Sequence, residues 1–247
     1  MNSLCRSVLR TRGVHTGGAL LKETPRNLKG KKHSSQLWLA RQLRDPYVEL
    51  AKQEKYRCRS AFKLLEINER FSVLEPGLTV IDCGAAPGSW TQVAANLTNA
   101  HGKKVDTPVG RVYAVDRLPF YPVEGATILG NMDFTKPKTQ ETLSELLRGD
   151  KVDIVLSDMA PNASGMREID HDNIMLLAYA ALRFALQISK AQGSLVVKVW
   201  DGGKAPQFEE NLSKFYSSVR VVRPDATRDE STEKFFLARG FKGLKTS

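Results

Sequence analysis

VIDCGAAPGSW, from Val80 to Trp90, predicts a short buried strand, a tight turn of small residues and the start of a helix. In doubly wound α/β sheets, this order of elements forms a nucleotide pocket. Glycines at 84 and 88 let a ligand approach the backbone, because no Cβ stands in the way. The spacing matches neither the G-x-G-x-x-G fingerprint nor a P-loop. Asp82 before the turn suits a positively charged ligand without pyrophosphate, such as S-adenosylmethionine. An ordinary βα turn is the alternative.

Apolar strands and helices alternate along the rest of the chain. Expected strands cover 79–83, 112–116, 127–129, 152–158, 194–200, 219–223 and 234–238, and expected helices cover 35–43, 46–52, 59–71, 90–99, 140–147, 174–189 and 207–215. Strand runs without polar alternation are typical of a sheet that is covered on both faces. A short polar loop separates the last two strands, so we expect them to pair antiparallel. The predicted fold is α/β and Rossmann-like, with a mostly parallel seven-stranded sheet, an antiparallel last strand and helices on both faces.

Aspartates follow the first four expected strands: Asp82, Asp116, Asp133 and Asp158. Ligands of open α/β sheets lie beyond the carboxyl ends of the strands. An acid after the second strand can accept both ribose hydroxyls, and Asp133 is placed to accept a hydrogen bond from an adenine amino group. A single aspartate at such a place is more often a helix cap or turn former. The four together favour a nucleoside ligand.

Lys198 stands in the apolar run LVVKVW at 195–200. A lysine there is costly unless it faces a cleft or an acid, although its stem could also extend to a sheet edge. The string SDMAPN at 157–162 lacks the Asn/Asp-Pro-Pro-aromatic pattern of many nitrogen methyltransferases. Enzymes that methylate carbon 5 of pyrimidines need a nucleophilic cysteine, and only Cys83 lies near a strand end. By elimination, the expected methyl acceptor is a hydroxyl, which needs a base or a positioned cation.

These motifs together resemble the FtsJ (RrmJ) family of large-subunit ribosomal RNA 2′-O-methyltransferases, and most of all its mitochondrial branch, which acts on a uridine. The resemblance runs from about Leu37 to Gly240 and includes DPYV at 45–48 and RCRSAFKL at 57–64. It implies S-adenosylmethionine as cofactor and a Lys-Asp-Lys-Glu tetrad on Lys63, Asp158, Lys198 and Glu233. With Asp82, the implied cofactor contacts are Gly84, Pro87, Gly88, Ser89, Trp90, Asp116, Asp133 and Asp158. The chain departs from the family at Ser89, where glycine or alanine is more common, and in a longer loop at 98–108.

The implied substrate is large-subunit ribosomal RNA in a ribosomal or pre-ribosomal particle. A basic segment ahead of the first strand is expected to bind it through Lys52, Lys55, Tyr56, Arg57 and Arg59. Cations would pair with phosphates and a base could stack on the tyrosine, although a solvated charged helix face is the ordinary alternative. Lys198 then either takes the hydroxyl proton or only positions the oxygen. Methylation of transfer RNA or another RNA, and a non-catalytic ribosome-assembly factor, are the alternative functions.

The net charge of +10 is concentrated at the N-terminal end. Residues 1–44 hold ten Lys/Arg and one acid, whereas the remaining residues hold 27 Lys/Arg and 26 Asp/Glu. Residues 1–21 contain no Asp or Glu and space Arg6, Arg10 and Arg12 among apolar and hydroxyl residues. This pattern is typical of a mitochondrial transit peptide, with a basic RNA-binding tail as the alternative. We therefore expect a mitochondrial matrix protein.

Four segments are expected: a leader at 1–30, a basic helical RNA-binding segment at 31–76, a methyltransferase domain at 77–240 and a tail at 241–247. No apolar run reaches the length of a membrane span. Cys5, Cys58 and Cys83 lack metal-ligand spacing, so we expect no metal site and no disulfide. We expect a monomer.

Overall fold

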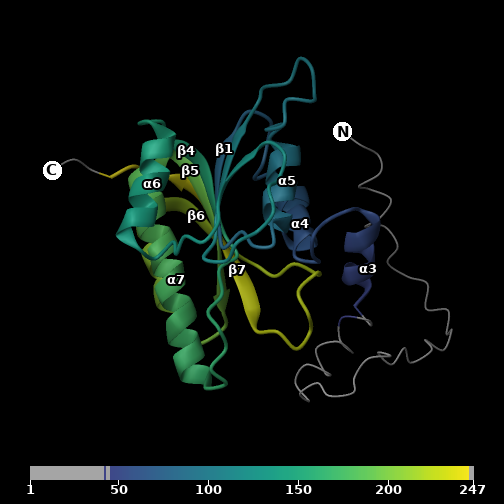
Figure 1. Cartoon of the computed structure of the whole chain (residues 1–247). Helices are drawn as coiled ribbons and strands as arrows, with labels where there is room; N and C mark the ends of the chain where they lie inside the picture. Colours follow the sequence, from purple (N-terminus) through teal and green to yellow (C-terminus); the bar gives the residue numbers. More distant parts are fainter. Residues whose placement is uncertain (1–41, 43–44, 245–247) are drawn as a thin grey trace. The chain divides into compact units, whose positions relative to one another are not determined.

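A computed structural model describes Gln42 and residues 45–244 of the chain, and a seven-stranded sheet lies at its centre (Figure 1). The strand order is β3-β2-β1-β4-β5-β7-β6. The strands are β1 (Thr79–Cys83), β2 (Arg111–Val115), β3 (Ala126–Leu129), β4 (Val152–Ser157), β5 (Ser189–Trp200), β6 (Tyr216–Val222) and β7 (Glu233–Phe241). Among strands β1 to β5, neighbouring strands pair parallel, and β7 is antiparallel to both β5 and β6. The mostly parallel seven-stranded sheet is confirmed, with β7 between β5 and β6.

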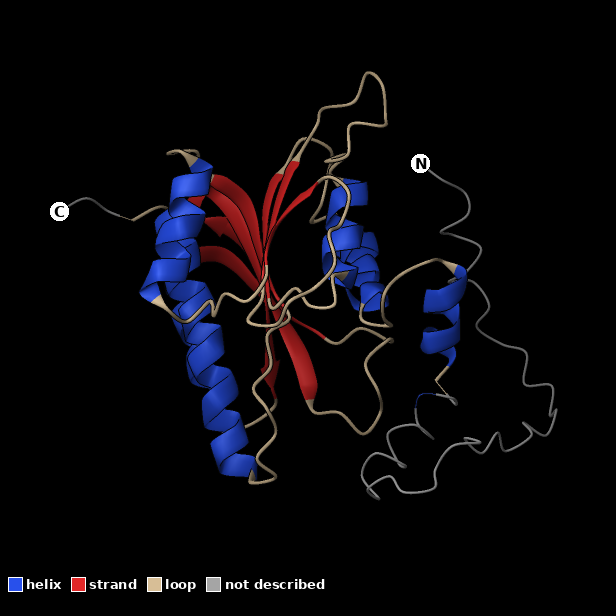
Figure 2. Cartoon of the chain, in the orientation of Figure 1, coloured by secondary structure: helices blue, strands red, loops and turns tan. Residues whose placement is uncertain are grey.

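Helices cover both faces of this sheet, as expected (Figures 1 and 2). They are α4 (Ala61–Phe71), α5 (Ser89–Leu97), α6 (Pro137–Leu147), α7 (Arg167–Ile188) and α8 (Ala205–Phe215). Helix α3 (Pro46–Gln53) precedes them, and its Ala51 belongs to a separate small core with Phe62 of α4. Helix α7 begins seven residues before the expected start at 174. Its first residues are polar and mostly exposed, so they carry no apolar periodicity, and acids in the first turn favour this helix start instead. Of the expected helix at 35–43, only Gln42 lies within the described residues.

Two cores lie on opposite faces of the sheet, because successive strand side chains point to opposite sides. Val80 of β1 belongs to the core that contains Leu64 of α4 and Val93 of α5. Ile81, the next residue, belongs to the other core, which contains Phe184 of α7. Every residue of β1 is buried. The central strand is therefore fixed from both sides, and the turn that follows it has a rigid base.

The chain divides into two compact units, Met1–Pro46 and Tyr47–Ser247. The first unit lies almost wholly outside the described residues. In the second, Ala61, Leu64 and Ile67 of α4 are buried in the same core as the sheet. Helix α4, which was expected within the RNA-binding segment at 31–76, thus lies in the unit that holds the sheet. In the part of the chain that is described, no helix is both long and apolar enough to cross a membrane.

Candidate active site

A pocket of about 770 Å³ opens beyond the carboxyl ends of β1, β2 and β4. The order of the strands reverses at β1, and open α/β sheets bind ligands at such a switch point. The wall of the pocket includes Gly84 and Ala86 of the turn after β1, together with Asp116, Asp133 and Asp158. Three of the four strand-end aspartates therefore face one space, and the pocket suits a ligand with several hydrogen-bond donors.

Asp116 connects the turn to the end of β2. Its Oδ2 accepts a hydrogen bond from the backbone N–H of Ala86 at 2.9 Å, and its Oδ1 accepts one from Leu118 N at 2.7 Å. A carboxylate has about four acceptor positions, so it can still accept from two ribose hydroxyls. Asp133 accepts from the hydroxyl and the backbone N–H of Thr135, and these bonds lower the pKa of its carboxyl. Asp133 is therefore ionised and able to accept from an amino group.

Asp82 is fully buried at the end of β1 and is not part of the pocket wall. Thr91 Oγ1 donates to its Oδ2 at 2.7 Å, whereas its Oδ1 has no hydrogen-bond partner among the described residues. Burial, together with the nearby Asp158 and Asp116, raises the pKa of Asp82 to about 7. A positively charged ligand in the adjoining pocket would favour the ionised form of this carboxyl.

The other predicted cofactor residues, Pro87, Gly88, Ser89 and Trp90, also lie outside the pocket wall. Trp90 Nε1 donates to the backbone oxygen of Ser60 at 2.8 Å, and the Trp90 ring packs 5.5 Å from the Phe235 ring. Ser89 Oγ lies 2.7 Å from Ser60 Oγ. These side chains bind α5 to the start of α4 and to β7. Only the backbone N–H groups in the first turn of α5 are left to meet a ligand, and they suit an anion.

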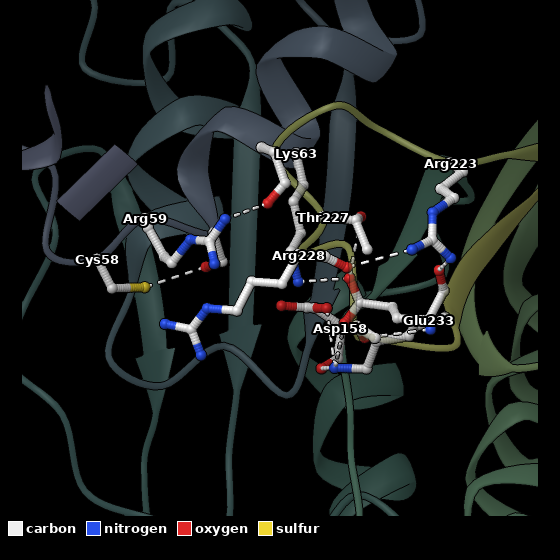
Figure 3. Close-up of polar contacts among 12 residues, drawn as sticks. Cys58, Arg59, Lys63, Asp158, Arg223, Thr227, Arg228 and Glu233 are labelled. Carbon is white, nitrogen blue, oxygen red and sulfur yellow. Dashed lines mark hydrogen bonds and ion pairs between the residues drawn. The ribbon is translucent and has the colours of Figure 1, made fainter. Parts of the chain in front are cut away.

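The four residues of the implied tetrad come together from four elements, and Figure 3 shows three of them, Lys63, Asp158 and Glu233. Lys63 lies on α4, Asp158 follows β4, Lys198 lies on β5 and Glu233 begins β7. Lys63 Nζ is 2.5 Å from Glu233 Oε1, and Lys198 Nζ is 2.9 Å from Asp158 Oδ1. Glu233 Oε2 is 4.0 Å from Lys198 Nζ. Antiparallel pairing of β5 with β7 places Trp200 opposite Glu233, two residues beyond Lys198.

Charges alternate along this tetrad, which explains how it can be buried. The side chains of Lys198 and Asp158 are only 7% and 16% exposed, and buried charges are stable only when they are paired. Lys198 Nζ also donates to the backbone oxygen of Asp158 at 2.5 Å. Since 4.0 Å to Glu233 is too long for a hydrogen bond, Lys198 keeps donor capacity for a substrate oxygen. Lys198 lies on an inner strand, so the sheet-edge alternative is wrong.

The loop between β6 and β7 contains contacts that sequence reasoning missed. Arg223 donates to the backbone oxygens of Arg228 and Asp229 at 3.2 and 3.3 Å, which folds the loop. Thr227 Oγ1 donates to Glu233 Oε1 at 3.4 Å. The Arg228 side chain extends from this loop toward Cys58 and Arg59 (Figure 3). No local pattern identifies these roles, because they depend on how the loop folds beside the tetrad.

A buried carboxylate on α4 anchors the same loop. Both oxygens of Glu66 accept from the backbone N–H of Ala226, at 3.0 and 3.3 Å. Tyr47 donates to Glu66 Oε1 at 3.2 Å. Glu66 is among the buried residues of α4. No local sequence pattern identified its role, because Tyr47 and Ala226 lie 19 and 160 residues away in the sequence.

The predicted RNA-binding residues divide into two groups. Lys52 and Lys55 are exposed. Tyr56 packs edge-on against Phe62, with ring centroids 5.8 Å apart. Arg57 donates to three backbone carbonyls, and Arg59 donates to the backbone oxygen of Ala226. The two lysines are therefore accessible to phosphates, although Lys52 Nζ also pairs with Glu49 Oε2 at 3.2 Å, while the other three side chains are less exposed and contact the protein.

Comparisons with known proteins show the family of the chain. The family model of FtsJ-like methyltransferases matches residues 56–241. The chain is 55% identical over 236 residues to "rRNA methyltransferase 2, mitochondrial" of Drosophila melanogaster, covering 95% of this chain and 94% of the relative. It is 44% identical over 215 residues to "Ribosomal RNA large subunit methyltransferase E" of Cereibacter sphaeroides, covering 87% of each.

A crystal structure described as that of a ribosomal RNA methyltransferase from Plasmodium falciparum shares the fold. Its TM-score is 0.66 at 24% identity, and the match covers 76% of this chain and all of that one. The family model matches most of the chain, and two relatives are 55% and 44% identical to it. The chain therefore belongs to the FtsJ-like methyltransferase family.

Proposed function

We propose that the protein transfers a methyl group from S-adenosylmethionine to the 2′-hydroxyl of a uridine in mitochondrial large-subunit ribosomal RNA. The observation that carries this proposal is the paired tetrad of Lys63, Glu233, Lys198 and Asp158 next to a pocket that Asp158 also lines. Membership of the family supports methyl transfer. The names of the relatives support ribosomal RNA as the substrate and mitochondria as the location.

The pocket and the residues that border it fit S-adenosylmethionine in three respects. Asp116 and Asp133 present acceptors for the ribose hydroxyls and the adenine amino group. The backbone N–H groups of Ser89 and Trp90, at the start of α5, suit the methionine carboxylate. Asp82 supplies a buried carboxyl that a nearby ammonium or sulfonium would ionise. When bound, this cofactor supplies a methyl group on a positively charged sulfur.

The tetrad then has distinct roles at the acceptor oxygen. Lys198 holds the 2′-oxygen by a hydrogen bond and, in its neutral form, takes the hydroxyl proton as the oxygen gains its methyl group. Asp158 orients Lys198 through the contacts at 2.9 and 2.5 Å. Glu233 pairs with Lys63, which keeps Lys63 beside the ribose. Holding the oxygen in line with the methyl group itself supplies a large part of the rate.

RNA is held by the exposed lysines of the α3 region, Lys52 and Lys55, through phosphate contacts. Tyr56, Arg57 and Arg59 shape this surface and border it. The substrate RNA is part of a ribosomal or pre-ribosomal particle, and the active enzyme is a monomer. The basic leader directs it to the mitochondrial matrix. The same proposal keeps the expected segments: a leader at 1–30, a basic segment at 31–76, a methyltransferase domain at 77–240 and a tail at 241–247.

Two alternative functions use the same geometry. A tetrad selects 2′-hydroxyl chemistry but not the RNA, so transfer RNA or another RNA is the first alternative. A non-catalytic assembly factor is the second. The buried pairing of two lysines argues against it, because binding alone does not need two largely buried ammonium groups, one of them on an inner strand.

Mapping 2′-O-methyl groups in mitochondrial RNA, with and without the gene, tests the proposal. One large-subunit uridine should lose its methyl group in the absence of the gene and regain it with the wild-type protein. A Lys198→Met protein is the matched control and should not restore it. Loss confined to transfer RNA would support the first alternative, and an unchanged methylation map would support the second.

A further inference from the structure

Arg57 was expected to bind RNA phosphates, but its guanidinium lies against the turn that borders the pocket. Nη1 donates to the backbone oxygen of Pro87 at 2.7 Å and to that of Tyr121 at 2.7 Å. Nη2 donates to the backbone oxygen of Pro122 at 2.6 Å. The Arg57 side chain therefore connects the turn after β1 to the segment between β2 and β3. Both lie 30 residues or more from Arg57 in the sequence.

Gly88, the residue after Pro87, is shaped to allow this contact. Its φ of +107° is one that L side chains rarely adopt. A Cβ at this position would also lie 2.4 Å from Arg57 Nη1 and 3.2 Å from Val123 Cγ2. Glycine at 88 therefore gives the guanidinium room to reach the turn, in addition to any approach of a ligand.

The backbone around Arg57 is bound to the same region. Arg57 N donates to Gln92 Oε1 at 2.9 Å, and Gln92 Nε2 donates to the backbone oxygen of Lys55 at 3.1 Å. Gln92 lies on α5, directly after the turn. The Arg57 side chain thus acts from a segment that is itself fixed to the helix whose first turn we assign to the methionine carboxylate.

We infer that Arg57 is a positioning residue for the cofactor, which it serves by holding the turn at 84–88 in its binding shape. The inference rests on the proposed function and refines it, since it moves one basic residue from the RNA site to the cofactor site. Arginine suits this task because its planar fork reaches three carbonyl oxygens at once, whereas a lysine ammonium is a point charge on a single-ended stem.

Arg57→Ala and Arg57→Lys, measured by steady-state kinetics and calorimetry, test the inference. For Arg57→Ala, the KM for S-adenosylmethionine and the Kd for S-adenosylhomocysteine should rise about tenfold or more, because several charge-assisted hydrogen bonds are lost. The kcat at saturating cofactor should stay within about twofold, since the tetrad does not contact Arg57. Arg57→Lys should resemble Arg57→Ala, although it keeps the charge.

Lys52→Ala is the matched control, since it removes one positive charge from the same region without touching the turn. It should raise the KM for ribosomal RNA transcripts and leave both cofactor constants unchanged. Gly88→Ala should weaken cofactor binding by itself, and it should cost less in the Arg57→Ala background, because the contact with Nη1 no longer exists.

An Arg57→Ala protein with normal cofactor constants and a raised KM for RNA would overturn the inference and return Arg57 to the phosphate site. A loss of kcat with normal cofactor constants would overturn it as well. If Arg57→Ala does not fold, Arg57→Lys decides by the same criteria. Binding of S-adenosylhomocysteine needs no RNA, so this result is separate from a failure of the proposed RNA substrate.

Discussion

At the scale of single residues, Lys198 shows how a charge is placed inside a sheet. It lies between Val197 and Val199, which are fully buried, and Asp158 compensates its charge. Lys198→Met keeps the length of the side chain and removes the charge, so the fold should persist. Methyl transfer should fall by about 10²–10⁴-fold, as is typical for loss of a positioned base. Single-turnover transfer to ribosomal RNA, with cofactor binding measured on the same samples, checks this.

Lys198→Arg separates proton removal from electrostatic positioning. Guanidinium keeps the positive charge but does not give up its proton at neutral pH, and it is too wide to hold one oxygen in the same place. The rate of the Lys198→Arg protein should therefore be nearly as low as that of Lys198→Met. A rate near wild type would eliminate the general-base role and leave the lysine as an electrostatic anchor.

Asp82 predicts a pH dependence of stability. Its pKa rises from 3.8 in the unfolded chain to about 7 in the folded protein, mainly through burial. Because the folded state binds this proton more tightly, protonated Asp82 adds to the free energy of unfolding. This addition is fully present below pH 4 and is lost as the pH rises to 7, a change of roughly 4 kcal/mol. Asp82→Asn removes this titration and retains an acceptor for Thr91. Relative to wild type, the ligand-free Asp82→Asn protein should gain unfolding free energy between pH 4 and 7 in urea titrations. If the difference in unfolding free energy between Asp82→Asn and wild type is the same at pH 5 and pH 8, Asp82 does not titrate in this way.

At the scale of elements, sequence patterns located most strands and helices because their apolar periodicities differ. Strand β1 matches its expected residues, and β4 differs by one residue at its end. The role of Arg57 could not be inferred in this way, since the carbonyls that it binds belong to residues 30 to 65 positions away. The basic pattern around it indicated RNA, although its guanidinium contacts the protein. Because parallel strands end at one edge of a sheet, the sequence predicted that Asp116, Asp133 and Asp158 would lie near one another. It did not predict that Asp82 is buried away from the pocket wall, since that depends on packing.

The loop between β6 and β7 depends on helix α4 through Glu66. Glu66→Ala leaves the buried N–H of Ala226 without its acceptor, which should lower the free energy of unfolding by about 1–3 kcal/mol. It should also lower kcat, because this loop leads directly to Glu233. Glu66→Gln keeps one acceptor oxygen and should lose less. Glu69→Ala on the exposed side of the same helix is the control and should change neither quantity. Urea unfolding and single-turnover rates measure both effects, and equal losses for the two alanine variants would contradict this role.

At the scale of the whole molecule, the sequence predicted the doubly wound architecture because strand and helix periods alternate along the chain. It did not predict that β7 lies between β5 and β6, since strand order depends on how the chain crosses the sheet. That insertion matters for the site, because it brings Glu233 next to β5 and within 4.0 Å of Lys198. Two of the four tetrad residues therefore come together through topology.

The uneven charge of the chain predicts that its first residues carry an address separate from catalysis. Each strand of the described sheet begins at Thr79 or later, so a shortened chain starting at Lys32 should fold and bind S-adenosylhomocysteine as the full chain does. Residues 1–30 fused to a fluorescent protein should enter mitochondria, because arginines without acidic neighbours are typical of transit peptides. Replacing Arg6, Arg10 and Arg12 with glutamine in the fusion is the control and should leave it in the cytosol. If the unaltered fusion also stays in the cytosol, and the shortened chain binds ribosomal RNA more weakly, the basic residues form an RNA-binding tail.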